Sequence, residues 1–164
     1  MFSLKEIAEV YKLGFNIEYF KVDDIIQWAD SIIERDNKPQ IAIIELSLSR
    51  GKSKREICDI LSEIKGDFNT IIPTKIILGI LYKTFVKEKN SIDFVSEFVE
   101  LLYKLSFYIP DDDISYDLIA LEDYFSVVKH EILDKDIQDV LNEIEKYLRK
   151  YKSLADDFLV HIEK

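Results

Sequence analysis

Cysteine, histidine, glycine and proline are all scarce in this chain of 164 residues, which has one, two, four and three of them. The single cysteine, Cys58, cannot form an internal disulfide, and a zinc site would need several cysteines or histidines close together. The four glycines lie far apart, whereas a phosphate-binding loop needs two or three within a few residues. We therefore expect no disulfide, no zinc and no cofactor, in a protein suited to a reducing cytoplasm.

Long hydrophobic runs are also missing. The most apolar window, residues 71–86, is interrupted by Pro73, Lys75, Gly79 and Lys83, and it falls short of the roughly 20 apolar residues that cross a bilayer. The first residues include the acidic Glu6 and no small-residue cleavage site, so they do not resemble a signal peptide. The sequence predicts no membrane span and no export.

Basic charge is in short supply, and unevenly so. The chain has 22 basic and 32 acidic side chains, a net charge of −10, and residues 111–164 alone carry 7 basic against 15 acidic. Such a surface repels phosphate backbones and attracts basic proteins. We expect a positively charged protein partner and no binding to nucleic acid or membrane.

What the chain does contain is helical periodicity from end to end. Apolar residues make up 48% of it, enough for a buried core, and its length is typical of a single domain, taken here as residues 1–164. Ser3 with Glu6, and Ser53 with Glu56, have the spacing of capping boxes. Helices are expected near residues 4–14, 23–36, 39–51, 53–66, 73–89, 92–105, 114–125 and 137–162, the last capped by Asp134 and with a break allowed near Ser153.

No useful stretch alternates with period two, so no sheet is expected. The prediction is an all-α fold, a single compact bundle of seven or eight antiparallel helices, with a short stack of helix pairs as the alternative. The segment from Ile41 to Leu48 is apolar almost all round. A helix of that kind belongs in the centre of a fold, so we expect it there.

Several residues could carry chemistry, but each has a simpler structural explanation. Cys58 lies beside apolar residues of its helix and is expected to be a buried structural thiol. His130 and His161 fall near helix ends, where a positive charge interacts favourably with the helix dipole. The acids from Asp111 to Glu122 partly match a calcium loop, yet Tyr116 stands where the turn needs glycine, so an acidic helix cap is favoured.

The aromatic residues fall into two groups. Five phenylalanines occupy apolar-face positions and are expected in the core: Phe85, Phe94, Phe98, Phe125 and Phe158. Four tyrosines lie near the acidic segment: Tyr103, Tyr108, Tyr116 and Tyr124. Tyrosine beside aspartate is common in protein-binding patches, although partial burial would explain each tyrosine equally well.

Three stretches of the chain share a pattern with known proteins: residues 25–30 (Ile-Ile-Gln-Trp-Ala-Asp) followed by Pro39, residues 43–47 (Ile-Ile-Glu-Leu-Ser) and residues 105–111 (Leu-Ser-Phe-Tyr-Ile-Pro-Asp). In this order they resemble the helical immunity proteins of bacterial polymorphic-toxin and contact-dependent inhibition loci. The resemblance implies a cytoplasmic protein without a cofactor that binds and neutralises a cognate toxin domain. A basic nuclease would be a suitable toxin, because an acidic patch can occupy a channel built for phosphate.

The acidic patch expected to bind such a partner consists of Asp111, Asp112, Asp113, Asp117, Glu122 and Asp123, with Tyr108 and Tyr116 as anchors. The acids of the last predicted helix, Asp136, Asp139 and Glu143, are an alternative surface. Two other functions stay open. One is a non-catalytic scaffold or regulatory adaptor. The other is a carboxylate-based metal-dependent hydrolase. It ranks last because the chain has no Glu-x-x-His motif.

Overall fold

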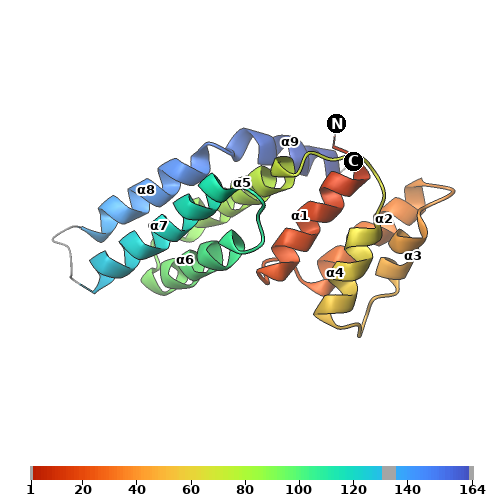
Figure 1. Ribbon diagram of the computed structural model, residues 1–164, viewed down its shortest axis with the longest axis horizontal. Helices are drawn as coiled ribbons and strands as arrows, with labels where there is room; N and C mark the ends of the chain where they lie inside the picture. Colours follow the sequence, from red (N-terminus) through yellow and green to blue (C-terminus); the bar gives the residue numbers. More distant parts are fainter. Residues whose placement is uncertain (1, 131–135, 163–164) are drawn as a thin grey trace. The chain divides into compact units, whose positions relative to one another are not determined.

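The computed structural model describes residues 2–130 and 136–162, and Figure 1 shows the order of their helices. The all-α prediction is confirmed, since these residues form helices and no strand. The described helices are α1 (Leu4–Asn16), α2 (Val22–Arg35), α3 (Ile41–Ser47), α4 (Lys54–Glu63), α5 (Ile71–Glu88), α6 (Ile92–Ser106), α7 (Asp112–Lys129), α8 (Ile137–Arg149) and α9 (Lys152–Ile162).

The expected count of seven or eight helices is too low, because the described residues contain nine. The long last segment divides between Arg149 and Lys152, close to the break allowed near Ser153. Asp134, the predicted cap of that segment, lies outside the described residues. The cap of α8 is Asp136, whose carboxylate accepts a hydrogen bond from the backbone N–H of Gln138 at 3.0 Å.

Both capping boxes are present. The Ser3 hydroxyl accepts a hydrogen bond from the backbone N–H of Glu6 at 3.1 Å, and the Glu6 carboxylate accepts one from the Ser3 N–H at 2.9 Å. Ser53 and Glu56 make the same reciprocal pair at the start of α4. These pairs satisfy backbone donors that have no partner within the helix, and so fix where each helix begins.

The first helix was expected to end near Gly14, and this end is wrong because α1 continues to Asn16. Gly14 has another role. The Phe20 ring packs against it so closely that a Cβ atom would lie 2.2 Å from a ring carbon. The missing side chain therefore admits an aromatic ring and does not mark the end of the helix.

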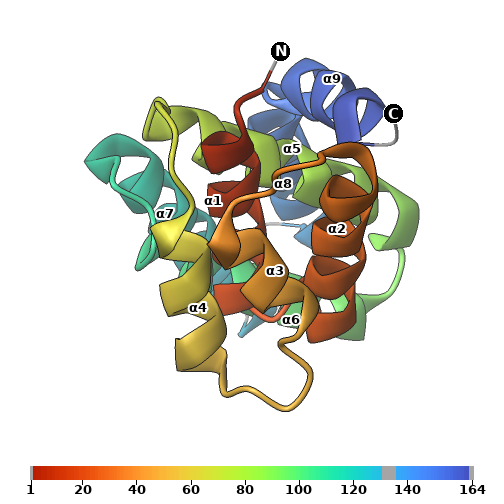
Figure 2. The ribbon, with the colours of Figure 1, turned by 90° about the vertical axis from the view of Figure 1, so that its right-hand side faces the viewer.

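The chain forms two compact units, Met1–Pro73 and Thr74–Lys164. In the first, α1 packs on α4, α2 packs on α3, and α3 packs on α4. Figure 2 shows α3 lying between α2 and α4. The core of this unit includes Trp28, whose ring stacks on Tyr11 with centroids 4.9 Å apart, and the fully buried Ile43, Leu46 and Leu61.

The central position predicted for the segment from Ile41 to Leu48 is wrong. Only one side of α3 is buried, while Ile41 and Leu48 are 75% and 73% exposed. The helix has seven residues, and α2 and α4 cover the side that carries Ile43 and Leu46. The helix that is buried almost all round is α5, where every residue from Ile76 to Tyr82 is buried.

In the second unit, α6 packs on α7 and α7 packs on α8. The predicted core phenylalanines are buried except for Phe94, which is half-buried. Gly79 in α5 allows close approach to the junction of α8 and α9, since a Cβ atom there would lie 2.3 Å from the Tyr151 carbonyl oxygen. The expectation of one domain over residues 1–164 remains a prediction, because α5 begins in one unit and continues in the other.

Candidate protein-binding surface

The turn between α6 and α7 is flanked by exposed aromatic side chains. Phe107, Tyr108 and Tyr116 are 65%, 47% and 71% exposed. Tyr103 is also exposed, and its ring meets that of Phe107 edge to face with centroids 5.0 Å apart. Large exposed aromatic residues are unusual on a surface that only faces water. We call the set Tyr103, Phe107, Tyr108 and Tyr116 the aromatic corner.

Hydrogen bonds between side chains and the backbone fix the turn that carries the aromatic corner. The Ser115 hydroxyl donates a hydrogen bond to the Ser106 carbonyl at 2.9 Å, which links the first turn of α7 to the last turn of α6. The Asp111 carboxylate accepts a hydrogen bond from the Ile114 N–H at 2.9 Å and is the N-cap of α7. The interpretation of Asp111 as a helix cap is therefore confirmed, and its carboxylate is already engaged.

The structure distributes the other predicted acids around α7. Successive residues of a helix are about 100° apart, so the buried Ile114, Leu118 and Phe125 define an inner side. Opposite that side the same spacing places Asp112, Tyr116 and Asp123. The remaining acids take other positions: Asp117 lines a groove beside α8, Glu122 lines a hollow beside α6, and Asp113 is exposed in the first turn.

The predicted site is thus not one continuous acidic patch. Its outward-facing part combines Asp112 and Asp123 with Tyr116 of the aromatic corner. Neither Asp112 nor Asp123 makes an ion pair with any residue that the structure describes. Their charges remain available to a partner.

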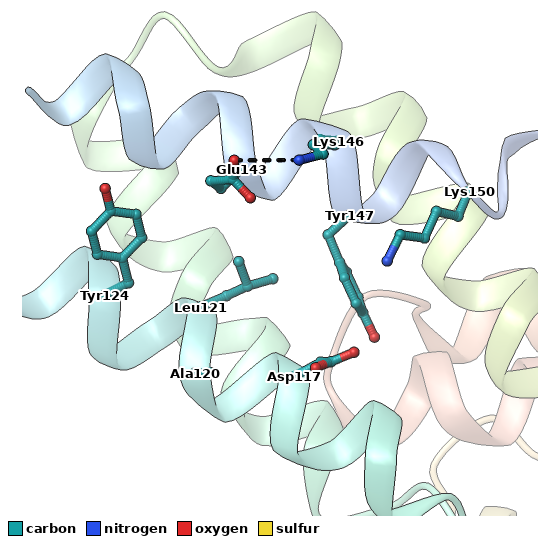
Figure 3. Close-up of a pocket in the computed structure, with 8 residues that line it drawn as sticks. All are labelled: Asp117, Ala120, Leu121, Tyr124, Glu143, Lys146, Tyr147 and Lys150. Carbon is teal, nitrogen blue, oxygen red and sulfur yellow. Dashed lines mark ion pairs between the residues drawn. The ribbon is translucent and has the colours of Figure 1, made fainter.

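A groove of about 430 Å³ runs between α7 and α8 (Figure 3). Asp117, Ala120, Leu121 and Tyr124 line it from α7, and Glu143, Lys146, Tyr147 and Lys150 line it from the other side. Lys146 pairs with Glu143 at 3.7 Å, and the Lys150 ammonium lies 4.5 Å from the centroid of the Tyr147 ring. Two acids and two bases balance one another, so the groove has no strong preference for either sign of charge.

Tyr147 is the most unusual residue of this groove. Its side chain reaches from α8 toward α7, and its hydroxyl lies beside the Asp117 carboxylate in Figure 3. The residue is only 8% exposed, yet its hydroxyl makes no hydrogen bond of ordinary geometry with the residues that the structure describes. Burial, followed by the effects of Tyr151 and Asp117, raises the pKa of Tyr147 far above its usual value. The hydroxyl therefore stays protonated.

Cys58 and His130 each have a polar partner within the fold. Cys58 is half-buried and not buried as expected, and its Sγ lies 3.4 Å from the Asn16 amide oxygen. Burial raises the pKa of the Cys58 thiol, which disfavours the nucleophilic thiolate. His130 is the C-cap of α7, as expected, with Nδ1 2.8 Å from the Ser126 carbonyl oxygen. Among the described residues no three acidic, histidine or cysteine side chains gather to hold a metal ion.

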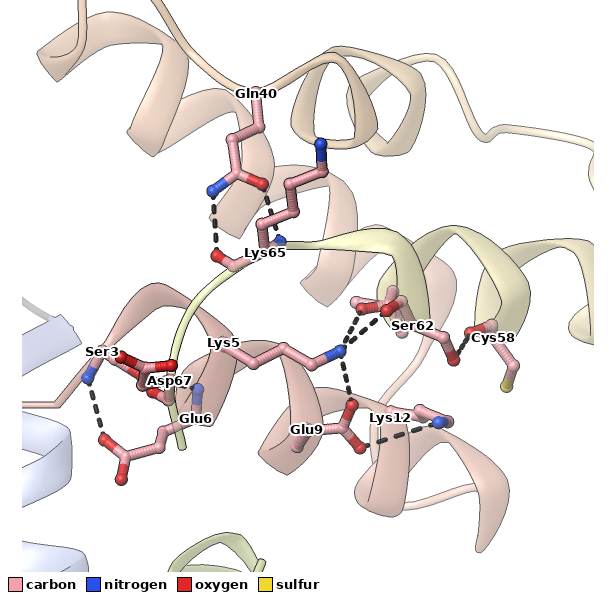
Figure 4. A network of polar contacts seen from close by, with 11 residues as sticks. Ser3, Lys5, Glu6, Glu9, Lys12, Gln40, Cys58, Ser62, Lys65 and Asp67 are labelled. Atoms are coloured by element: carbon pink, nitrogen blue, oxygen red, sulfur yellow. Dashed lines mark hydrogen bonds and ion pairs between the residues drawn. The ribbon is translucent and has the colours of Figure 1, made fainter. Parts of the chain in front are cut away.

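A further polar cluster surrounds Lys5, which is 8% exposed (Figure 4). Its ammonium forms an ion pair with Glu9 at 2.8 Å and donates hydrogen bonds to the carbonyls of Ser62 at 2.8 Å and Leu61 at 3.5 Å. These carbonyls belong to the last turn of α4 and lack partners within the helix. Because every group is satisfied, the cluster has a structural role and joins α4 to α1.

Comparison with known proteins gave no match: no family model, no curated protein and no solved structure is similar to the chain. Among the described helices, none is long and apolar enough to cross a membrane. The exposed aromatic and acidic residues themselves define the candidate surface.

Proposed function

We propose that the protein works by binding a basic protein partner through the aromatic corner and the outward-facing acids of α7, Asp112 and Asp123. The observation that carries this proposal is the exposure of Phe107, Tyr108 and Tyr116 near Asp112 and Asp123, which form no ion pair within the part of the chain that the structure describes. Aromatic side chains are frequent binding hot spots, because they bury a large area and lose little conformational entropy.

The negative charge of the chain indicates that the partner is positively charged. The chain carries a net charge of −10, and most of the excess lies in residues 111–164, which include α7. Negative charge around an interface speeds association with a positive protein and disfavours negative competitors. We infer a division of roles in which the acids guide the encounter and the aromatic residues supply most of the affinity.

The resemblance to immunity proteins suggests which kind of basic protein the partner is. The partner would be a cognate toxin domain, and the protein would neutralise it by covering its active surface in the cytoplasm. A toxin that acts on nucleic acid would present a basic channel, which suits the proposed acidic surface. No catalytic group or cofactor is needed for such inhibition.

The test is a titration against the products of the genes that neighbour its own. Asp112→Lys/Asp123→Lys should weaken binding of a basic product by at least about tenfold at low salt, since each reversal replaces attraction with repulsion. Wild-type affinity should fall as salt rises, because salt screens exposed charges. Tyr116→Ala should weaken binding mainly through faster dissociation.

Glu97→Lys/Asp157→Lys is the matched control. It changes the net charge by the same amount at two other exposed positions of the same unit. If this control weakens binding as strongly as the reversal on α7, only net charge matters and the proposed surface is wrong. If none of the neighbouring products binds, the immunity function is rejected.

A scaffold or regulatory adaptor is the second candidate function. The observation that favours it is a separate exposed apolar surface on α3, where Ile41 and Leu48 are largely exposed. An adaptor would need two binding surfaces, whereas inhibition of one toxin needs only one. Binding of two proteins at once by the wild-type chain would support the adaptor.

A further inference from the structure

The exposed side of α3 forms an apolar stripe. Ile41, Ile44 and Leu48 are 75%, 42% and 73% exposed, and they follow one another at spacings of three and four residues. Residues at these spacings lie along the same side of a helix. The opposite side carries the buried Ala42, Ile43 and Leu46. Three large aliphatic side chains facing water along a helix of seven residues and its C-cap, Leu48, indicate a surface that is covered by a binding partner.

An acidic hollow lies next to this stripe. It has a volume of about 390 Å³ and shares Leu48 with the stripe; Ile60 of α4 adds a second apolar side chain. The charged residues that line it are Glu45, Lys52, Glu56 and Asp59. Three carboxylates against one ammonium give the hollow a negative charge.

Little within the described residues neutralises that charge. Glu45 makes no side-chain ion pair there, and Asp59 meets only Arg55, at 3.9 Å. Both members of that pair are largely exposed, so their attraction is weak. Hydrogen bonds from Ser53 lower the pKa of Glu56, which keeps its carboxylate ionised. Because Glu56 is already engaged in its capping box with Ser53, a cation entering the hollow would pair with Glu45 or Asp59.

These observations narrow the choice of occupant. In a symmetric dimer the same surface faces itself, so a second copy would bring these carboxylates against their own equivalents. An anionic membrane surface would be repelled for the same reason. A partner with an apolar side and basic side chains avoids both problems.

We propose that the α3 stripe and its acidic hollow bind a basic amphipathic helix. The apolar face of that helix covers Ile41, Ile44 and Leu48, while one of its lysine or arginine side chains enters the hollow. The seven residue-to-residue steps from Ile41 to Leu48 span about 10 Å of helix axis, so two turns of a partner helix are enough. This surface shares no residue with the aromatic corner, and the proposal does not depend on the function proposed for that corner.

The apolar part of the proposal is tested with a labelled peptide of leucine and lysine, about 14 residues long and patterned as an amphipathic helix. Fluorescence anisotropy measures its affinity for the whole protein. Ile41→Ser/Leu48→Ser should weaken binding by at least about tenfold, since two anchors lose their apolar contacts. Ile92→Ser is the control, because Ile92 is 50% exposed in the other unit. It should leave the affinity unchanged.

The charged part needs a second comparison. Glu45→Lys/Asp59→Lys should weaken binding of the same peptide by at least about tenfold at low salt. Asp112→Lys/Asp123→Lys makes the same charge change at the aromatic corner and should have a much smaller effect. A leucine and glutamate peptide of identical pattern should not bind. These arms separate the α3 surface from the general attraction of an acidic protein for a basic peptide.

Three outcomes would overturn the proposal. The first is a peptide affinity that is insensitive to both α3 variants while circular dichroism shows them folded. The second is equal binding of the glutamate peptide, which would remove the need for a basic partner. The third is a wild-type dimer in sedimentation that Ile41→Ser/Leu48→Ser converts to a monomer, which would assign the stripe to a second copy of the chain.

Discussion

The Tyr147 hydroxyl is a buried polar group that need not stabilise the folded protein. Within the described residues it has no hydrogen-bond partner, and the Asp117 carboxylate lies beside it. Removing an unsatisfied polar group can be nearly neutral or stabilising. We predict that Tyr147→Phe changes the free energy of unfolding by less than about 1 kcal/mol or increases it, as measured in urea. A loss above about 2 kcal/mol would show that the hydroxyl has a partner, such as a bound water.

Gly79 offers a second prediction at the residue scale. Helix propensity alone would make Gly79→Ala stabilising, by up to about 1 kcal/mol. The added Cβ atom, however, would lie 2.3 Å from the Tyr151 carbonyl oxygen and 2.6 Å from the Ala155 Cβ. We therefore expect a net loss of about 1–3 kcal/mol, the usual cost of overpacking.

The control for this change is Val86→Ala, also in α5 but 39% exposed. It should change the free energy of unfolding much less than Gly79→Ala, because surface substitutions usually have small effects. Stabilisation by Gly79→Ala would contradict the close packing of α5 against the start of α9.

At the scale of elements, one ion-pair cluster ties α8 to the end of α5. Glu145 of α8 pairs with Lys89, which directly follows α5, and with Arg149 one turn further along α8. The hydrogen bond from Lys89 is the main cause that lowers the pKa of Glu145, and the one from Arg149 adds to it, against the opposing effect of burial.

This lowered pKa predicts a pH dependence. Above about pH 4.3, the pKa of glutamate in the unfolded chain, the cluster makes its full contribution to the free energy of unfolding. This contribution is lost as the pH falls through the lower pKa that Glu145 has in the folded protein. Glu145→Gln should therefore be less stable than wild type at neutral pH, and the difference should shrink on acidification below about pH 4. Urea titrations across this range measure the difference. A constant difference down to pH 3 would contradict the ionic origin of the contribution.

The start of a helix could be predicted from the sequence wherever neighbouring residues determine it. The two serine boxes fix the starts of α1 and α4, and Asp111 fixes that of α7, because a cap needs only residues that are close in sequence. Burial was less predictable. The segment from Ile41 to Leu48 and α5 are both strongly apolar, and the pattern alone does not say how many neighbours will cover each helix.

In the candidate site, too, features set by neighbouring residues could be predicted and features set by packing could not. The acids and tyrosines near α7 could be proposed from composition, because aromatic and acidic residues lie close together in the chain. Their division around α7 follows only once the buried side of the helix is known. Asp117 and Tyr147 line the same groove although they are far apart in sequence, so no local signal predicted that they would lie close together.

At the scale of the whole molecule, the single tryptophan provides a test of domain organisation. Trp28 lies in Met1–Pro73, so its fluorescence reports unfolding of that unit, while far-ultraviolet circular dichroism reports helices in both units. Because α5 crosses the boundary, we predict that the two signals give coincident urea curves, as for one cooperative domain. Separate midpoints would contradict the prediction of one domain over residues 1–164.

Binding of a basic protein at the aromatic corner and the outward side of α7 would protect the backbone of that surface from solvent. Hydrogen–deuterium exchange of the protein, alone and saturated with a basic product of a neighbouring gene, tests it most directly. We predict slower exchange from Ser106 to Asp123, with smaller changes in α1 and α9. A stable complex that leaves exchange in that segment unchanged would contradict the claim.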